Sequence, residues 1–183
     1  VEGGAGIVAA AVERWGRVDI VINNAGFLRD VAFHRMSAEH FEAVLKVHLF
    51  GTFAVTRAAW PHMREAGYGR VVLITSINGL YGTFGQGNYS AAKAAMIGLA
   101  KTLAKEGESK GIKVNALAPG GGTAMTATVM PPELVAKWLP VRGGVAVGEP
   151  IQHDNRDMAR EAGGGTGRER LTAVGLNACA KAH

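Results

Sequence analysis

The stretch VDIVINNAG, residues 18–26, decides the fold class of this 183-residue chain. Its first five residues form a continuous, mostly β-branched apolar run, which is typical of a strand buried inside a parallel sheet. The run ends in the turn signal Asn23-Asn24-Ala25-Gly26. RVVLIT at 70–75 and IKVNAL at 112–117 repeat the pattern. These two runs predict a second and a third strand.

Helical patterns alternate with these strands. A short one covers residues 6–15, a long one capped by Ser37 covers 38–66 with a kink or restart at Pro61, and a third covers 88–107. Alternating strands and helices predict a doubly wound parallel α/β sheet, Rossmann-like and partial, with the two long helices on its faces.

Ligands of such sheets bind beyond the carboxyl ends of the strands. The three predicted strand ends carry the Asn23–Gly26 turn, Ser76, and Pro119 with the glycines Gly120–Gly122. All three segments are therefore expected to meet at one rim of the sheet, where a functional site would form.

Tyr89 and Lys93 are one helical turn apart in NYSAAKAAMIGLAKTLAKEG, residues 88–107. Residues four apart share a helix face, and a nearby ammonium would lower the pKa of a phenol toward neutral pH. Such a tyrosine could transfer a proton, and Ser76 could donate to the same oxygen. Taken singly, the tyrosine–lysine spacing can be chance and Ser76 an ordinary cap. Their order at successive strand ends argues for a site.

The chain resembles the short-chain dehydrogenase/reductase family in NNAG at 23–26, Ser76, YSAAK at 89–93 and NALAPG at 115–120. The likeness covers roughly residues 7–138. Within the family, the chain most resembles the (3R)-hydroxyacyl-CoA dehydrogenase branch of multifunctional enzymes. The resemblance implies catalytic roles for Ser76, Tyr89 and Lys93. It also implies a nicotinamide cofactor, bound by Asn23, Ala25, Gly26, Tyr89, Lys93, Pro119, Gly120 and Thr123.

His48, in KVHLFG, stands where the wider family usually has a helix asparagine. We include it among the candidate catalytic residues. The reading as a buried core histidine is favoured over direct catalysis, and holding a proton-relay water is the alternative.

The resemblance implies an NAD(P)-dependent oxidoreductase that interconverts a hydroxyl and a carbonyl, with a 3-hydroxyacyl or 3-oxoacyl-CoA as the expected substrate. A 3-oxoacyl-carrier-protein reductase is the enzymatic alternative, and a catalytically silent truncated chain is the non-enzymatic one. The hydroxyacyl-CoA likeness favours NAD, but no residue excludes NADP. The family's opening strand and T-G-x-x-x-G-x-G turn are not found, so we expect the N-terminal third of the fold to be missing.

Residues 1–138 are therefore interpreted as a truncated Rossmann-like domain. Residues 139–183 lack Phe, Tyr and Trp and are rich in Gly, Ala and Arg. We interpret them as a weakly structured tail, for which out-of-frame translation is one hypothesis.

Composition limits the other function classes. The net charge is +5, but the basic residues are scattered, which favours a solvated surface over a nucleic-acid site, while an anionic small-molecule partner also fits. No apolar run predicts a membrane span, and no metal site is predicted. One cysteine and no signal peptide favour a cytoplasmic location. Wide apolar stripes on the long helices predict a homo-oligomer for the complete protein.

Overall fold

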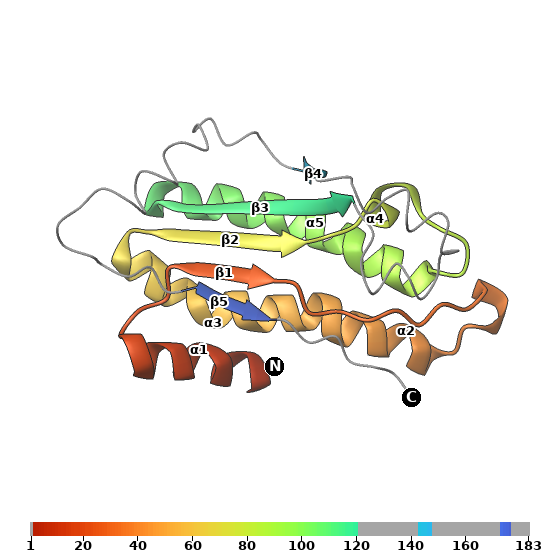
Figure 1. The fold of residues 1–183 in the computed structure, drawn as a ribbon, viewed down its shortest axis with the longest axis horizontal. Helices are drawn as coiled ribbons and strands as arrows, with labels where there is room; N and C mark the ends of the chain where they lie inside the picture. The colour runs from red at the N-terminus through yellow and green to blue at the C-terminus, as the bar shows by residue number, and fades with distance from the viewer. Residues whose placement is uncertain (1, 121–142, 148–172, 177–183) are drawn as a thin grey trace.

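The structure is a computed structural model that describes residues 2–120, 143–147 and 173–176 (Figure 1). Along the chain its elements are α1 (Glu2–Trp15), β1 (Ile20–Asn23), the 3-10 turn η1 (Phe33–Arg35), α2 (Ala38–Leu45), the π-helical turn η2 (Lys46–Phe50), α3 (Gly51–Ala66), β2 (Gly69–Ile74), α4 (Asn78–Tyr81), α5 (Gly87–Gly107), the 3-10 turn η3 (Glu108–Lys110), β3 (Ile112–Gly120), β4 (Gly143–Val147) and β5 (Ala173–Leu176).

The strands form one open sheet in the order β4-β3-β2-β1-β5. β1, β2 and β3 are parallel, with Val21 opposite Val71 and Val71 opposite Val114. This arrangement confirms the predicted Rossmann-like parallel sheet. The three predicted strands are present with small changes at their ends: β1 begins at Ile20, and β3 continues through Pro119 to Gly120.

The helix predicted over 38–66 begins as expected, because the Ser37 hydroxyl accepts a hydrogen bond from the His40 amide. It is interrupted at η2 rather than at Pro61, which lies inside α3 without ending it. The expected restart at Pro61 is therefore wrong. The irregularity lies one element earlier, at the turn that carries His48.

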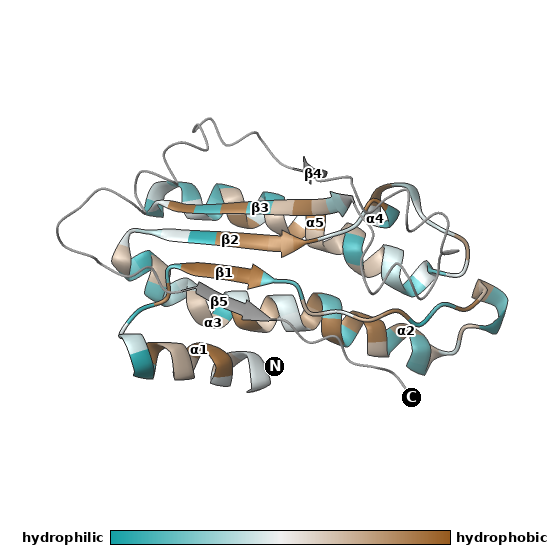
Figure 2. Ribbon diagram, in the orientation of Figure 1, coloured by the Kyte–Doolittle hydropathy of each residue, from teal (hydrophilic) through white to brown (hydrophobic). Residues whose placement is uncertain are grey.

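The apolar core lies between the sheet and a single layer of helices. Val21, Val71, Leu73 and Ala116 point to this face and are buried, together with Val55 of α3. In Figure 1, α3 and α5 both lie behind the sheet, and α1 packs against α3. Figure 2 shows apolar residues concentrated in β1 and in the second half of β2.

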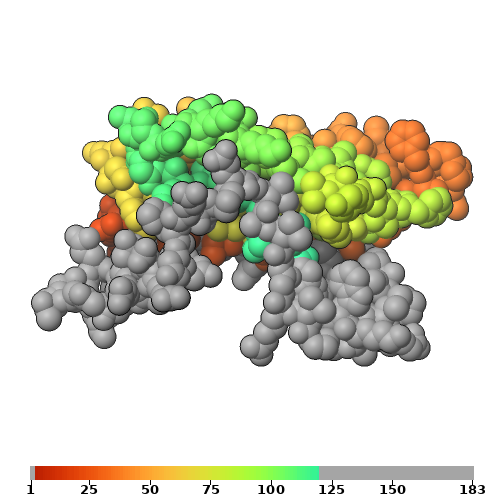
Figure 3. Space-filling model, turned by 90° about the horizontal axis from the view of Figure 1, so that it is seen from above, coloured from red at the N-terminus to blue at the C-terminus, as the bar shows by residue number. Residues whose placement is uncertain are grey.

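We expected the two long helices on the faces of the sheet, and both pack on the same face. The alternation of buried and half-buried residues along β2 agrees with this arrangement, since one set of side chains meets the helices. Figure 3 shows α2, in orange, next to the lime-coloured start of α5 on this side of the molecule. Both crossovers, β1 to β2 and β2 to β3, therefore run over this face.

Two short strands lie within the range that we interpreted as a weakly structured tail. β4 pairs antiparallel with β3, and β5 pairs parallel with β1, where Val174 is opposite Val21. No alternation in the sequence predicted either strand. The rest of 139–183 lies outside the described residues.

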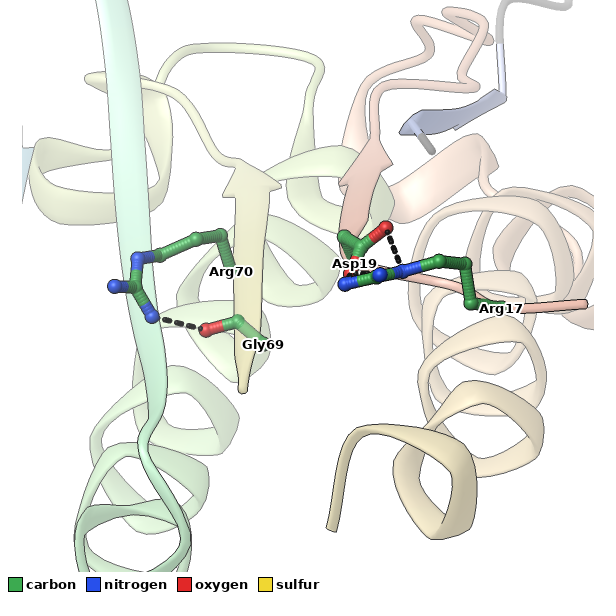
Figure 4. Close-up of polar contacts among 4 residues, drawn as sticks. All are labelled: Arg17, Asp19, Gly69 and Arg70. Carbon is green, nitrogen blue, oxygen red and sulfur yellow. Dashed lines mark hydrogen bonds and ion pairs between the residues drawn. The ribbon is translucent and has the colours of Figure 1, made fainter. Parts of the chain in front are cut away.

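The amino ends of β1 and β2 are held by two arginines (Figure 4). Arg17 contacts both carboxylate oxygens of the buried Asp19, at 2.7 and 3.0 Å. Arg70 donates to the carbonyls of Gly69 and Gly111 and lies 4.2 Å from the ring centre of Tyr68. These contacts are at the opposite end of the sheet from the predicted site.

Candidate active site

The candidate site forms where the parallel strands end. β1 ends at Asn23, and Ser76 follows β2 by two residues. Tyr89 and Lys93 lie in the first two turns of α5, with α4 packed against them. The structure therefore brings Ser76, Tyr89 and Lys93 together, as the strand ends predicted.

Tyr89 is 8 % exposed, and the Ser76 side chain is close enough to act on its phenol as a hydrogen-bonding neighbour. Burial raises the pKa of the phenol, the bond to Ser76 lowers it, and the charge of Asp30 raises it further. The net result is a pKa above the ordinary tyrosine value. We expected Lys93 to lower it, and in this structure the opposite direction prevails, because burial outweighs the favourable contacts.

Lys93 is 3 % exposed, and its ammonium donates to the carbonyl of Ile74 at 2.5 Å. The nitrogen lies 5.6 Å from the ring centre of Tyr89. Burial lowers the lysine pKa to about 8. The ammonium is thus directed to a strand carbonyl, and the causes that shift the Tyr89 pKa are burial, Ser76 and Asp30 rather than Lys93.

His48 lies directly beside Tyr89, with its ring edge-on to the phenol ring and 5.2 Å between the centres. It is 1 % exposed, and its Nε2 lies 2.8 Å from the Phe27 carbonyl. Burial and the charge of Lys93 lower its pKa to about 4. The histidine is therefore neutral near pH 7. Its buried Nδ1 has no hydrogen-bond partner among the described residues.

The NNAG segment makes contacts within the protein that the sequence did not predict. Asn23 is buried and donates from Nδ2 to the Thr56 hydroxyl at 2.9 Å, which ties β1 to α3. A Cβ on Gly26 would lie 2.2 Å from His48 Cε1. The absence of a side chain at Gly26 therefore lets the His48 ring lie against the backbone, and the predicted approach of a ligand to this glycine stays a prediction. Ala25 is half-buried.

The third strand end is only partly described. Pro119 is exposed, and the antiparallel ladder to β4 pairs it with Gly144 and pairs Gly120 with Gly143. Both residues therefore lie in a strand rather than in the expected loop. Thr123 lies outside the described residues.

Sequence reasoning missed four polar residues that surround Ser76 and Tyr89: Asp30, Asn78, Gln86 and Asn88. Asn88 is fully buried, donates to the carbonyls of Arg29 and His40, and accepts from the Tyr89 amide at 2.7 Å. The amides of Gln86 and Asn88, directly before Tyr89 in a segment of small residues, were the signal that could have revealed two of them.

The sequence model of the family described as short chain dehydrogenase matches residues 5–134. The chain belongs to this family. It is 53 % identical over 139 residues to a short-chain type dehydrogenase/reductase of Mycobacterium tuberculosis, a match that covers 76 % of this chain and 49 % of that protein. It is also 49 % identical to mouse peroxisomal multifunctional enzyme type 2, over 76 % of this chain and 19 % of the enzyme.

An acetoacetyl-CoA reductase of Rhizobium meliloti is 48 % identical over 136 residues, covering 74 % of this chain and 56 % of that protein. Among solved structures, a short-chain dehydrogenase from Streptomyces avermitilis superposes with a TM-score of 0.64 at 38 % identity, over 67 % of this chain and 45 % of that one. This short-chain dehydrogenase chain thus spans about half the length of its mycobacterial relative.

Members of this family generally use NAD or NADP, and the described residues fit the nicotinamide end of such a cofactor. Lys93 carries three N–H donors, of which the Ile74 carbonyl accounts for one. The others can serve ribose hydroxyls beside the tyrosine. Among the described residues no group of His, Cys, Asp or Glu could hold a metal ion, and no helix is long and apolar enough to cross a membrane.

Proposed function

We propose that this chain is part of an NAD(P)-dependent oxidoreductase that interconverts a hydroxyl and a carbonyl. One observation carries the proposal: Ser76 and Tyr89 are close enough for the serine to act on the phenol, next to the buried Lys93, at the carboxyl ends of parallel strands. Two hydroxyls at this place can both donate to one substrate oxygen. Family membership supports the assignment of redox chemistry to the site.

The residues would act as follows when a carbonyl is reduced. Tyr89 has a raised pKa, so it holds its proton near neutral pH and donates it to the substrate oxygen. Ser76 donates a second hydrogen bond to that oxygen. The bound nicotinamide ring would supply the hydride. In the reverse direction Tyr89 must first be a phenolate, which the Lys93 ammonium would stabilise, and this phenolate then accepts the proton of the substrate hydroxyl.

We propose a 3-hydroxyacyl or 3-oxoacyl-CoA as the substrate. The support comes from relatives named acetoacetyl-CoA reductase and peroxisomal multifunctional enzyme type 2. Over the matched residues, 48–50 % of their residues are identical to those of this chain. A positive net charge of +5 suits the acidic groups of such a carrier. A 3-oxoacyl-carrier-protein reductase has the same chemistry and is the second candidate. We propose NAD as the cofactor. We also propose a reducing, cytoplasmic compartment, because the chain has a single cysteine and so cannot form a disulfide within itself.

Cofactor binding by this chain is the first test. We expect the 183-residue protein to bind NADH saturably, with an increase in cofactor fluorescence, and Lys93→Met to weaken binding because it removes the ribose donors. Tyr89→Phe keeps the ring and should bind normally. No saturation at millimolar NADH would support the catalytically silent alternative.

Turnover of acetoacetyl-CoA by the complete enzyme is the second test. Tyr89→Phe should lower kcat by about 10²-fold or more, because general acid catalysis is lost. Tyr81→Phe, at an exposed tyrosine, is the matched control and should be unchanged. Turnover that survives Tyr89→Phe would show that another group donates the proton.

We further propose that the protein self-associates through α3 and η2. Phe50 and Phe53 are 51 % and 45 % exposed there, beside Val47. Apolar side chains grouped on one helical face are typical of a protein–protein contact. A second copy of the chain is the occupant that we propose, through an isologous contact.

A further inference from the structure

Three side chains that the mechanism above does not use form a hydrogen-bonded bridge beside Ser76. Gln86 is 4 % exposed, and its Nε2 donates to Asp30 Oδ2 at 2.8 Å. Its Oε1 accepts from Asn78 Nδ2, also at 2.8 Å. The backbone N–H of Asn78 then donates to Ser76 Oγ at 3.2 Å. We call Asp30, Gln86 and Asn78 the amide bridge.

The Asp30 carboxylate determines which groups donate and which accept along the amide bridge. An ionised carboxylate only accepts, so Gln86 must turn its NH₂ group toward Asp30 and its oxygen toward Asn78. Asn78 must therefore use its own NH₂ group as the donor. A flipped glutamine amide would face two mismatched partners while buried, which is costly.

Gln86 lies at a position where side chains often cap a helix, yet its hydrogen bonds go to the amide bridge. Gln86 directly precedes α5 as its N-cap residue, but its side chain makes no capping hydrogen bond. Glutamine is not among the residues preferred at this position. Next to it, the Val31 amide donates to the Gly85 carbonyl at 2.8 Å, so the segment after β1 is held against the start of α5.

Ser76 connects the amide bridge to the Tyr89 phenol. The Asn78 N–H occupies one lone pair of Oγ, which leaves fewer orientations for the Ser76 hydroxyl, and the Ser76 side chain lowers the pKa of the Tyr89 phenol as a hydrogen-bonding neighbour. Gly79 keeps α4 close to α5, since a Cβ there would lie 2.8 Å from the Lys93 carbonyl carbon. The short helix that carries Asn78 is therefore supported on both sides.

We propose that Gln86 is a positioning residue that, together with Asp30 and Asn78, orients the Ser76 hydroxyl toward Tyr89. The inference rests on the proposed function, because it takes Ser76 and Tyr89 as the proton-donating pair. Gln86 touches neither substrate nor cofactor in this proposal. It acts only through Asn78 and Ser76.

Titration of the Tyr89 phenol tests the inference without cofactor or substrate. The full chain is labelled with fluorotyrosine, which ionises at lower pH than tyrosine, and each of its three tyrosines is followed by ¹⁹F NMR. Tyr89→Phe assigns the resonance, and Tyr68 and Tyr81 are internal references. Among the described residues, the charged or titratable groups near Tyr89 are Lys93, His48 and Asp30, and none of the variants below substitutes them, although Gln86→Met removes a hydrogen bond to Asp30.

Gln86→Met removes both hydrogen bonds at similar volume. It should raise the Tyr89 midpoint, with a change in ionisation constant of about threefold or more, because the Ser76 donor is no longer aimed at the phenolate. Ser76→Ala should raise it in the same direction. The double variant should not exceed Ser76→Ala alone, because Gln86 acts through Ser76. Thr83→Val removes a hydroxyl of the same loop that bonds only to Gly82 and should leave the midpoint unchanged.

A shift with Ser76→Ala but none with Gln86→Met would overturn the inference and leave the proposed function intact. Full additivity of the two variants would also overturn it. If Ser76→Ala does not shift the midpoint, Ser76 does not interact with Tyr89, and the proposed function, which rests on that pair, is contradicted as well. Asn78→Leu cuts the bridge at its other end, and it replaces Gln86→Met if that variant does not fold.

Discussion

At the residue scale, burial decides the charge of the groups around Tyr89. His48, Tyr89 and Lys93 are each less than one tenth exposed. The pKa of each is shifted in the direction that favours its neutral form: it is lowered for His48 and Lys93 and raised for Tyr89. Burial disfavours charge, and the opposing contacts in this structure do not compensate for it. The pattern Tyr-x-x-x-Lys predicted the neighbours correctly and the direction of the phenol pKa wrongly.

His48 should make the stability of the fold sensitive to acid. Its pKa is about 4 in the folded protein and near 6.5 in the unfolded chain, so between these values only the unfolded state takes up a proton. Stability should therefore fall as the pH drops from about 6.5 to about 4, by about 3 kcal/mol from this residue.

Urea denaturation at a series of pH values measures this contribution in the wild type and in His48→Asn. The variant lacks the titrating ring, so its stability should fall less steeply over the same window, whatever its stability at pH 7. Parallel pH profiles for the two proteins would contradict a buried neutral histidine.

At the element scale, two local features set the geometry of the helical layer. The π-helical turn η2 joins α2 to α3 and directs His48 inward, and such turns are frequent at functional sites. α1 and α3 meet at Gly4, where a Cβ would lie 2.7 Å from Ala54 Cβ and 2.8 Å from the Val55 nitrogen. The close approach of these two helices therefore requires a glycine on α1.

Gly4→Ala should separate α1 from α3 and destabilise the fold by about 1–3 kcal/mol, as overpacking usually does. Gly6→Ala is the matched control on the same helix, because no atom lies within 4 Å of its added Cβ. That change should stabilise the protein by up to about 1 kcal/mol through helix propensity. Thermal unfolding compares the two, and equal shifts would contradict the packing of α1 described here.

At the scale of the whole molecule, the open sheet collects residues that are far apart in the chain. Asp30 lies in the connection from β1 to β2, while Ser76 and Tyr89 lie in the connection from β2 to β3, and they meet because parallel strands end at the same rim. Phe50 and Phe53 are exposed on the helical layer, where a second copy of the chain is proposed to bind.

Phe53→Glu should lower the average molar mass measured by sedimentation or light scattering, because a charge in a self-associating apolar face is repelled by its symmetry mate. Phe84→Glu changes an equally apolar residue that is 91 % exposed in another part of the molecule and should leave the mass unchanged. A wild-type chain that remains monomeric at high concentration would exclude self-association of this chain.

The sequence by itself determined the Rossmann-like sheet and the candidate residues Ser76, Tyr89 and Lys93. Continuous apolar runs, helical periodicity and the Ser37 cap are local signals, and local signals are what a sequence displays directly. The tertiary structure alone decided that His48 fills the space above Gly26, that α3 and α5 share one face, and that Gln86 bridges Asp30 to Asn78. These are contacts between segments far apart in the chain. Burial and hydrogen bonding at such contacts depend on how the elements pack, which is why the direction of the Tyr89 pKa could not be predicted from a spacing of four residues.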